Sequence, residues 1–282
     1  MTDCLVKMTQ LMDTLPPAEK RAARCFWEHP EKMQAATIAE AALACGTSKA
    51  TLVRMCKSLG YKGYKDFSFA FTLSAASGKD KHIEYQELSP GDDVATLMQR
   101  ITAQNLDAVR DTTLLLSEND VDRAAALLHK AKRVDFYGVG MSALVALDAQ
   151  MKFMRLCKDT QTSMDPHVQV VMAARLKKGD AAVIFSYSGE TRDALDTLAA
   201  VKRAGATAIS VTRLGVSPLS RGADLSLHVA SSENLVRSAA MSSRIAMMHL
   251  MDLLFSAVAV RGYQRYKPAL DKTHLEGKYK KK

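Results

Sequence analysis

Residues 38–54, IAEAALACGTSKATLVR, have the spacing of a helix-turn-helix unit, in which two short helices are joined by a tight turn. Ala42 is the small residue needed where the two helices touch, and Gly46 supplies the turn. Leu52 and Met55 are the apolar residues that would anchor the second helix to a core. A helical hairpin with a solvated basic face has the same spacing, so spacing alone leaves both interpretations open.

The second helix of this unit has the residue types that read duplex DNA. Residues 47–65 contain five Lys or Arg and no acidic residue. Short polar side chains near a helix start, followed by cations, suit base edges and phosphates in the major groove. We expect Lys49, Thr51 and Arg54 to face the groove, and Ser48 to cap the helix and reach a phosphate. The lysines expected to position phosphates are Lys57, Lys62 and Lys65.

The rest of residues 1–76 also has helical periodicity, so we predict an all-helical DNA-binding domain over this range. Residues 77–91, SGKDKHIEYQELSPG, lose that periodicity and contain Gly, Ser and Pro. They are the predicted linker between two domains.

The pattern changes after residue 133. Short apolar runs at 134–137, 181–185, 208–212 and 225–229 alternate with helical stretches. Strands buried on both faces form such runs, and strand–helix alternation indicates parallel crossovers. The predicted fold class is therefore α/β, with the all-helical domain followed by a three-layer parallel-sheet domain over 92–265. Residues 266–282 are predicted to be a basic C-terminal tail.

Two loops follow predicted strands and combine Gly with Ser or Thr just before a helix. They are residues 138–142, GVGMS, and residues 186–191, SYSGET. A helix N-terminus presents free N–H groups and a positive dipole end, which suit a phosphate. In open α/β sheets, ligands bind at the carboxyl ends of the strands. The same groups also cap helices, so a phosphate site and simple capping both remain open.

Composition limits the class of protein. With 39 Lys+Arg and 30 Asp+Glu, the formal net charge is +9, which favours a nucleic-acid partner. The content of 48% hydrophobic residues excludes a wholly disordered chain. The apolar run 245–260 contains His249 and Asp252 and is shorter than the roughly 20 residues of a bilayer crossing. The first residues lack a signal-peptide pattern. We therefore expect a cytoplasmic protein with no membrane partner.

The five cysteines are odd in number and form no CxxC pair. We expect reduced, mostly buried thiols, no bound metal and no cofactor.

Residues 46–67, GTSKATLVRMCKSLGYKGYKDF, closely resemble the N-terminal domain of the RpiR family of bacterial transcriptional regulators. The family pattern has Ser, a short polar residue and Arg, and then LG-[YF]-x-G-[YF]-x-[DE]-[FL]. The loop SYSGET resembles the hallmark of the sugar isomerase (SIS) domain, whose usual first element is a loop like GVGMS. This second resemblance covers about residues 120–260, and RpiR regulators have an SIS domain after the helix-turn-helix.

The resemblance implies a set of ligand-binding residues. A phosphate would be held by Ser142, Ser186, Ser188 and Thr191 and by the N–H of Gly189. The glycines Gly138 and Gly140 would allow the backbone to approach it closely. Glu233 is a candidate acceptor for sugar hydroxyls. The implied partners are double-stranded DNA, a phosphorylated sugar or sugar acid that modulates operator affinity, and further copies in a homodimer or homotetramer.

Sugar isomerisation would need a placed base, and Glu190, Glu233 and His167 are the plausible ones. No pair among them is compelling, so we assign no catalytic residue and expect a regulator, not an enzyme. The alternatives are a sugar-phosphate isomerase or related SIS enzyme with an accessory basic domain, and an architectural protein with an empty pocket.

Overall fold

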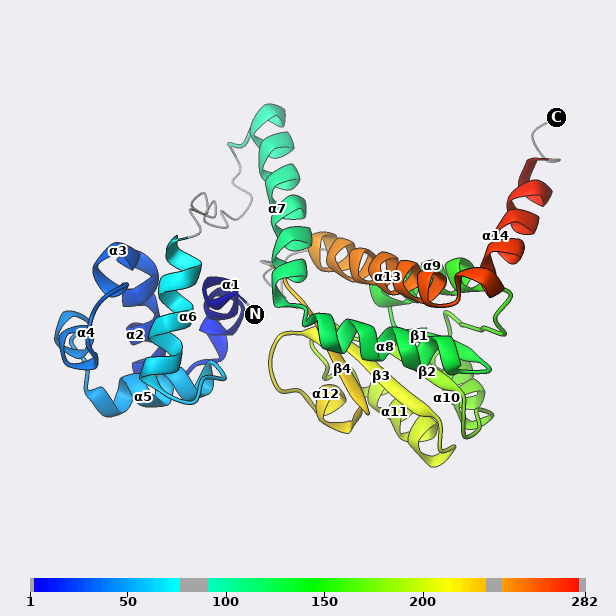
Figure 1. Cartoon of the computed structure of the whole chain (residues 1–282), viewed down its shortest axis with the longest axis horizontal. Helices are drawn as coiled ribbons and strands as arrows, with labels where there is room; N and C mark the ends of the chain where they lie inside the picture. Colours follow the sequence, from blue (N-terminus) through cyan, green and yellow to red (C-terminus); the bar gives the residue numbers. More distant parts are fainter. Residues whose placement is uncertain (1–2, 77–90, 232–239, 279–282) are drawn as a thin grey trace. The chain divides into compact units, whose positions relative to one another are not determined.

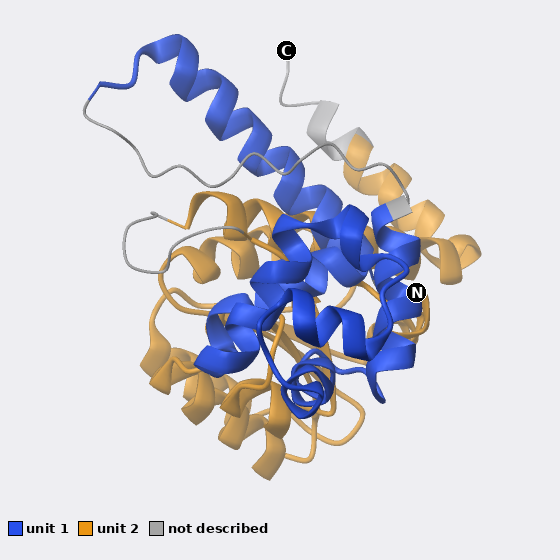
Figure 2. Cartoon of the chain, turned by 90° about the vertical axis from the view of Figure 1, so that its left-hand side faces the viewer, with its two compact units in different colours: residues 1–115 blue, residues 116–282 orange. Residues whose placement is uncertain are grey.

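The computed structural model describes residues 3–76, 91–231 and 240–278, and it divides into two compact units (Figures 1 and 2). Unit 1 is Met1–Leu115 and unit 2 is Leu116–Lys282. The predicted linker lies outside the described residues, apart from Gly91. The division assigns the helix after the linker to unit 1, whereas the sequence grouped it with the second domain.

Unit 1 is all helical, as predicted. Its elements are α1 (Cys4–Leu11), the short 3-10 helix η1 (Met12–Thr14), α2 (Pro17–Glu28), α3 (Pro30–Met33), α4 (Ile38–Ala44), α5 (Lys49–Ser58), α6 (Tyr64–Ala76) and α7 (Val94–Leu115). Local sequence explains the helix-turn-helix. Thr37 and Glu40 form a capping box at the start of α4, and Ser48 caps α5. Gly46 has a φ of +56° between the two helices, a conformation that costs glycine little.

The core of unit 1 is aromatic. Phe26 of α2 packs edge-to-face against Phe67 and Phe71 of α6, with ring centroids 5.1 and 5.3 Å apart. Leu52 and Met55 are fully buried in the same cluster, so they anchor α5 as predicted. This packing leaves one side of α5 exposed.

A disulfide joins Cys25 of α2 to Cys45, the residue that ends α4. Their Cα atoms are 5.6 Å apart, within the range for a disulfide. The expectation of five reduced thiols is therefore wrong for this pair, because pairing depends on tertiary proximity across 20 residues of sequence and not on a local motif. Cys4 and Cys56 are buried free thiols, and Cys157 is an exposed one.

Unit 2 alternates strands and helices. Its elements are α8 (Glu118–Lys130), β1 (Val134–Gly138), α9 (Met141–Met154), α10 (Pro166–Ala174), β2 (Ala181–Phe185), α11 (Arg192–Arg203), β3 (Thr207–Arg213), α12 (Pro218–Gly222), β4 (Leu225–Val229), α13 (Met241–Arg261) and α14 (Tyr263–Lys278). The four strands are parallel and lie in the order β1-β2-β3-β4. Helices α8, α9 and α13 cover one face, and α10, α11 and α12 cover the other (Figure 1). The predicted three-layer α/β domain is confirmed.

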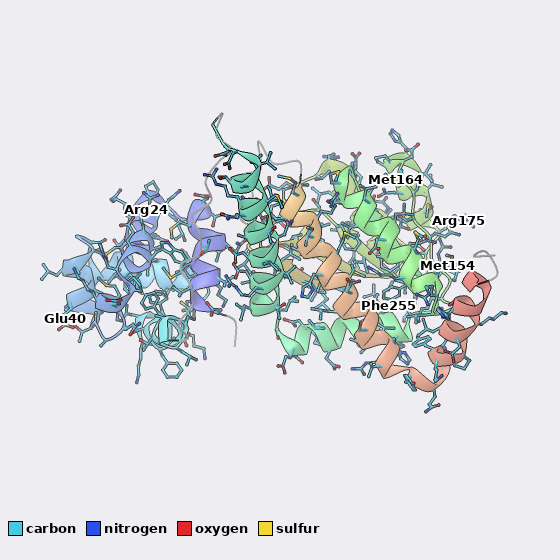
Figure 3. All side chains as sticks on the ribbon, turned by 90° about the horizontal axis from the view of Figure 1, so that it is seen from above. Arg24, Glu40, Met154, Met164, Arg175 and Phe255 are labelled. Carbon is cyan, nitrogen blue, oxygen red and sulfur yellow. A yellow bond between two sulfur atoms is a disulfide. The ribbon has the colours of Figure 1, made fainter. Side chains whose placement is uncertain are left out.

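Helix α13 is long and apolar enough to cross a membrane by length and composition. It packs beside α9 (Figure 3). Phe255 of α13 meets Phe153 of α9 with ring centroids 6.0 Å apart. It also contacts α8 and β4, as the core helix of a folded domain does.

Most of the predicted basic tail is helical, because α14 continues to Lys278. Tyr266 of α14 is buried, and its ring packs edge-to-face on His129 of α8. That contact attaches the start of α14 to unit 2.

Candidate DNA-binding and ligand-binding sites

Helix α5 exposes most of the side chains predicted to contact DNA. Ser48, Lys49, Arg54 and Lys57 are exposed, and Lys62 is exposed just after the helix. The Ser48 hydroxyl accepts a hydrogen bond from the Thr51 N–H at 3.1 Å, so its predicted capping role is present. The cations therefore lie where a nucleic acid could reach them.

Thr51 differs from the prediction. Its side chain is buried, at 6% exposure, and does not face outward. Its hydroxyl lies 3.0 Å from the Ser48 hydroxyl and accepts a hydrogen bond from Arg54 Nη2 at 3.0 Å. Thr51 thus contacts its exposed neighbours Ser48 and Arg54, because α5 packs this side against the domain.

Sequence reasoning missed an acidic residue beside α5. Glu19 of α2 is buried, and its carboxylate lies 3.8 Å from Arg54 Nε. The Ser58 hydroxyl donates to the same carboxylate at 2.7 Å. No local pattern signals this pairing, because Glu19 and Arg54 lie on different helices.

In unit 2, the two Gly-containing loops begin side by side. Gly138 ends β1 and is in register with Phe185, which ends β2. A Cβ at Gly138 would come within 2.6 Å of the Ser142 carbonyl oxygen, so glycine allows the first loop to fold onto the start of α9. Gly140 precedes α9 with a φ of +60°.

The second loop is held by its own hydroxyls. The Ser186 hydroxyl donates to Thr191 Oγ1 at 3.1 Å and accepts from the Gly189 N–H at 3.2 Å. Gly189 has a φ of +69°, and a Cβ there would meet Ser217 Oγ at 2.1 Å. The Ser188 hydroxyl accepts from the Glu190 N–H at 3.2 Å. The loop therefore requires glycine for both its conformation and its close packing.

The two loops precede helices that have no side-chain cap. Gly140 and Thr191 are the N-cap residues of α9 and α11, and neither makes a side-chain cap hydrogen bond. Side chains cap α8, α10 and α12 in the same unit, whereas α13 also begins without a side-chain cap. Capping therefore does not explain the Thr191 hydroxyl, and both helix N-termini present the dipole end that suits an anion.

A buried glutamine also supports the first loop. Gln169 of α10 is 1% exposed, and its amide donates to the carbonyl oxygens of Gly138 and Ser163, both at 2.7 Å. It lies 31 residues from Gly138 in the sequence, and no motif marks it.

The candidate acidic and basic groups are less well placed. Glu190 and His167 are exposed. Glu233 lies outside the described residues. Among the residues that the structure describes, no group of three or more His, Cys, Asp or Glu could hold a metal ion.

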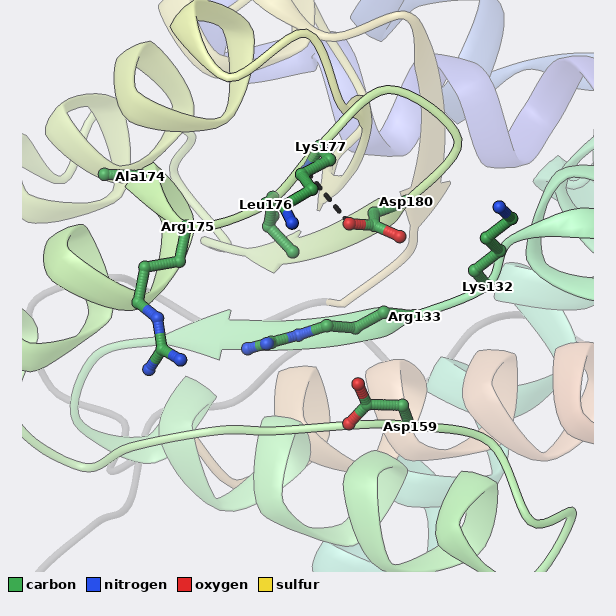
Figure 4. Close-up of a pocket in the computed structure, with 8 residues that line it drawn as sticks. All are labelled: Lys132, Arg133, Asp159, Ala174, Arg175, Leu176, Lys177 and Asp180. Carbon is green, nitrogen blue, oxygen red and sulfur yellow. Dashed lines mark hydrogen bonds between the residues drawn. The ribbon is translucent and has the colours of Figure 1, made fainter.

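One cavity of about 590 Å³ lies elsewhere in unit 2 (Figure 4). It is beside the N-terminal ends of β1 and β2, at the opposite edge of the sheet from the two loops. Its charged lining residues are Lys132, Arg133, Asp159, Arg175, Lys177 and Asp180. This mixed lining does not include any residue of the predicted phosphate site.

Comparisons with known proteins match both units. The helix-turn-helix domain model of the rpiR family matches residues 2–78, and the SIS domain model matches residues 127–257. An HTH-type transcriptional regulator of Caldanaerobacter subterraneus subsp. tengcongensis is 36% identical over 267 residues, covering 93% of each chain. HexR, an HTH-type transcriptional regulator of Pseudomonas aeruginosa, is 30% identical and covers 96% of this chain and 94% of its own.

A solved structure is also similar over nearly the whole chain. The NanR protein of Vibrio vulnificus, complexed with ManNAc-6P, has a TM-score of 0.60 and 25% identity, with 96% of each chain covered. The fold and the matches define a two-domain protein, a helix-turn-helix joined to an SIS domain. The chain belongs to the rpiR family and is an HTH-type transcriptional regulator.

Proposed function

We propose that this regulator reads a specific duplex operator with α5, and that a phosphorylated sugar or sugar acid bound at residues 138–142 and 186–191 changes its operator affinity. The observation that supports this best is the pair of uncapped helix N-termini, preceded by adjacent Gly-containing loops at the carboxyl edge of the sheet. This is the place where open α/β sheets bind ligands.

The chemistry of the loops favours a phosphate over a neutral sugar. Backbone N–H groups and the hydroxyls of Ser142, Ser188 and Thr191 are donors for phosphate oxygens. Hydrogen bonds to a charged acceptor are about twice as strong as neutral ones, so the unphosphorylated sugar would lose most of its affinity. The NanR protein, which is similar to this chain over 96% of each chain, is complexed with ManNAc-6P, a sugar phosphate.

We infer sensing without turnover. The relatives compared above are named as transcriptional regulators. Glu190 and His167, two of the bases considered from the sequence, are exposed. A sensor that consumed its effector would also erase its own signal.

We also infer that the protein acts in the cytoplasm, because a regulator of chromosomal genes works where the DNA lies.

We also propose that the chain acts as a homodimer or higher homo-oligomer through α9. Leu144, Leu147, Met151 and Met154 recur at helical spacing along α9 and are 38–55% exposed. A stripe of exposed apolar side chains is typical of an interaction surface. A second copy is the occupant that fits, because helix-turn-helix proteins read two half-sites as symmetric dimers.

Direct ligand binding tests the proposed site. We would titrate the full chain with sugar phosphates, phosphorylated sugar acids and their unphosphorylated counterparts, using calorimetry. Wild type should bind at least one phosphorylated compound, and Ser188→Ala with Thr191→Ala should abolish that binding. Ser256→Ala removes an exposed hydroxyl of α13 outside both loops and should bind as wild type does. If the double variant retains full affinity, the loops are not the binding site.

A further inference from the structure

We propose that Glu19, on α2 and outside the recognition helix, is a positioning residue that aims the Arg54 guanidinium for base reading. This inference depends on the proposed reading of an operator by α5. Its basis is a network of side-chain contacts that runs along α5 and ends on a buried carboxylate of another helix.

Arg54 is held from two directions. Its Nη2 donates to Thr51 Oγ1 at 3.0 Å, and its Nε lies 3.8 Å from Glu19 Oε1. The side chain nevertheless remains 59% exposed. Arg54 is the one arginine of α5, and its guanidinium is therefore both restrained and accessible to a groove.

The contacts extend over the whole helix. The Ser48 hydroxyl at the N-cap lies 3.0 Å from Thr51 Oγ1, and Thr51 accepts from Arg54. At the other end, Ser58, the last residue of α5, donates to Glu19 Oε2 at 2.7 Å. Glu19 thus contacts both the reading side chain and the end of the helix that presents it.

The first turn of α2 accommodates a carboxylate at position 19, because the helix dipole favours a negative charge there. Buried charges are costly, and apolar residues of similar volume commonly pack as well or better. Glu19 is 6% exposed, and its carboxylate contacts Arg54 and Ser58 of α5. A carboxylate is suited to orienting a guanidinium, because it attracts the positive charge and leaves N–H groups of the Arg fork available; Glu19 Oε1 and Arg54 Nε, 3.8 Å apart, form an ion pair and not a hydrogen bond. Orientation before binding reduces the entropy lost when Arg54 meets a base.

The positioning role predicts two effects of opposite sign for Glu19→Gln. Glutamine keeps the size of the side chain and can still accept from Ser58. Loss of the negative charge frees Arg54, so binding to non-specific DNA should strengthen and depend more steeply on salt, by a slope of about 1. At the same time, discrimination at the base pair that Arg54 reads should fall.

The test starts from a reference duplex selected from a random-sequence library by the full-length wild-type protein. Variants of this duplex, each with one base pair changed, are titrated by fluorescence anisotropy. Arg54→Ala should lose about tenfold discrimination at one position of each half-site. Glu19→Gln should lose discrimination at the same position and no other, and the double variant should match Arg54→Ala alone. Lys57→Ala is the control, which should weaken all duplexes equally.

Two results for Glu19→Gln would overturn the proposal. One is an unchanged discrimination profile, and the other is an equal loss of discrimination at every position. If melting shows that Glu19→Gln does not fold, Glu19→Asp keeps the charge and withdraws the carboxylate from Arg54 by one methylene. Its discrimination should fall at the Arg54 position, and an unchanged value there refutes positioning. If wild type selects no sequence at all, the proposed operator reading fails, and the role of Glu19 falls with it.

Discussion

Replacement of Gly189 by alanine should damage the second loop by two separable effects. The backbone has a φ of +69°, where an L-residue costs about 1–2 kcal/mol. The new Cβ would also lie 2.1 Å from Ser217 Oγ and 2.6 Å from Ser217 Cβ, so Ser217 must move. Ser217 caps α12 by accepting from the Ser220 N–H, and loss of such a cap costs about 1 kcal/mol. The expected destabilisation is therefore about 2–3 kcal/mol.

Thermal unfolding measures this loss. For a unit of this size, about 2–3 kcal/mol corresponds to a fall in Tm of about 5–10 °C. Gly179→Ala is the matched control, since Gly179 also has a positive φ but would meet no atom within 4 Å. It should show the backbone cost alone. Adding Ser217→Gly to Gly189→Ala should restore part of the loss, because it removes the side chain that blocks the new Cβ.

The close approach of Gly189 to Ser217 would be refuted by two results. One is a Gly189→Ala protein as stable as Gly179→Ala. The other is a Ser217→Gly change that adds its own cost to Gly189→Ala without any recovery.

Three further predictions concern other parts of the chain. The Cys25–Cys45 disulfide closes a loop of about 20 residues and should stabilise unit 1 by about 3 kcal/mol, so reductant should lower the Tm of wild type but not of Cys25→Ser. Burial lowers the pKa of His228 below its usual 6.5, so the unfolded chain binds a proton there more readily than the folded protein. The stability associated with neutral His228 is complete above pH 6.5 and is lost as the pH falls below that value. The Tm of wild type should therefore drop from pH 7.5 to pH 5.5, and the Tm of His228→Asn should drop less. Met151→Glu places a charge in the exposed stripe of α9 and should shift sedimentation toward monomer, whereas an unchanged mass would exclude that face as the interface.

The fold could be predicted from the sequence because its signals are local. Periodicity places a helix over 49–59, and Ser48 and Gly46 mark its start and the preceding turn. Continuous apolar runs locate the four strands, since a parallel sheet with helices on both faces buries each strand. The sequence does not predict helix α14, because its many polar residues leave only a weak helical repeat of apolar side chains. The attachment of α14 also depends on His129, which is distant in the sequence.

The candidate site was predicted in part for the same reason. Loops 138–142 and 186–191 adjoin because parallel strands end at one edge, which follows from topology. The burial of Thr51 and the contact of Glu19 with Arg54 depend on how α2 packs on α5, which residue spacing does not specify. Gln169 reaches the Gly138 carbonyl from another helix, so it too required the tertiary structure.

Coupling between the two units is the property that makes the protein a sensor. Coupling free energies are typically about 1–3 kcal/mol, or roughly 5- to 150-fold in affinity, and they are reciprocal between the two ligands. The measurement is an operator titration of the full chain with and without the phosphorylated compound that binds best, for wild type and for Ser188→Ala with Thr191→Ala. We predict that the compound changes the operator Kd of wild type at least about fivefold, and that the double variant binds operator normally but does not respond. An operator Kd that no bound sugar phosphate changes, or a double variant that responds as wild type does, would contradict regulation through these loops.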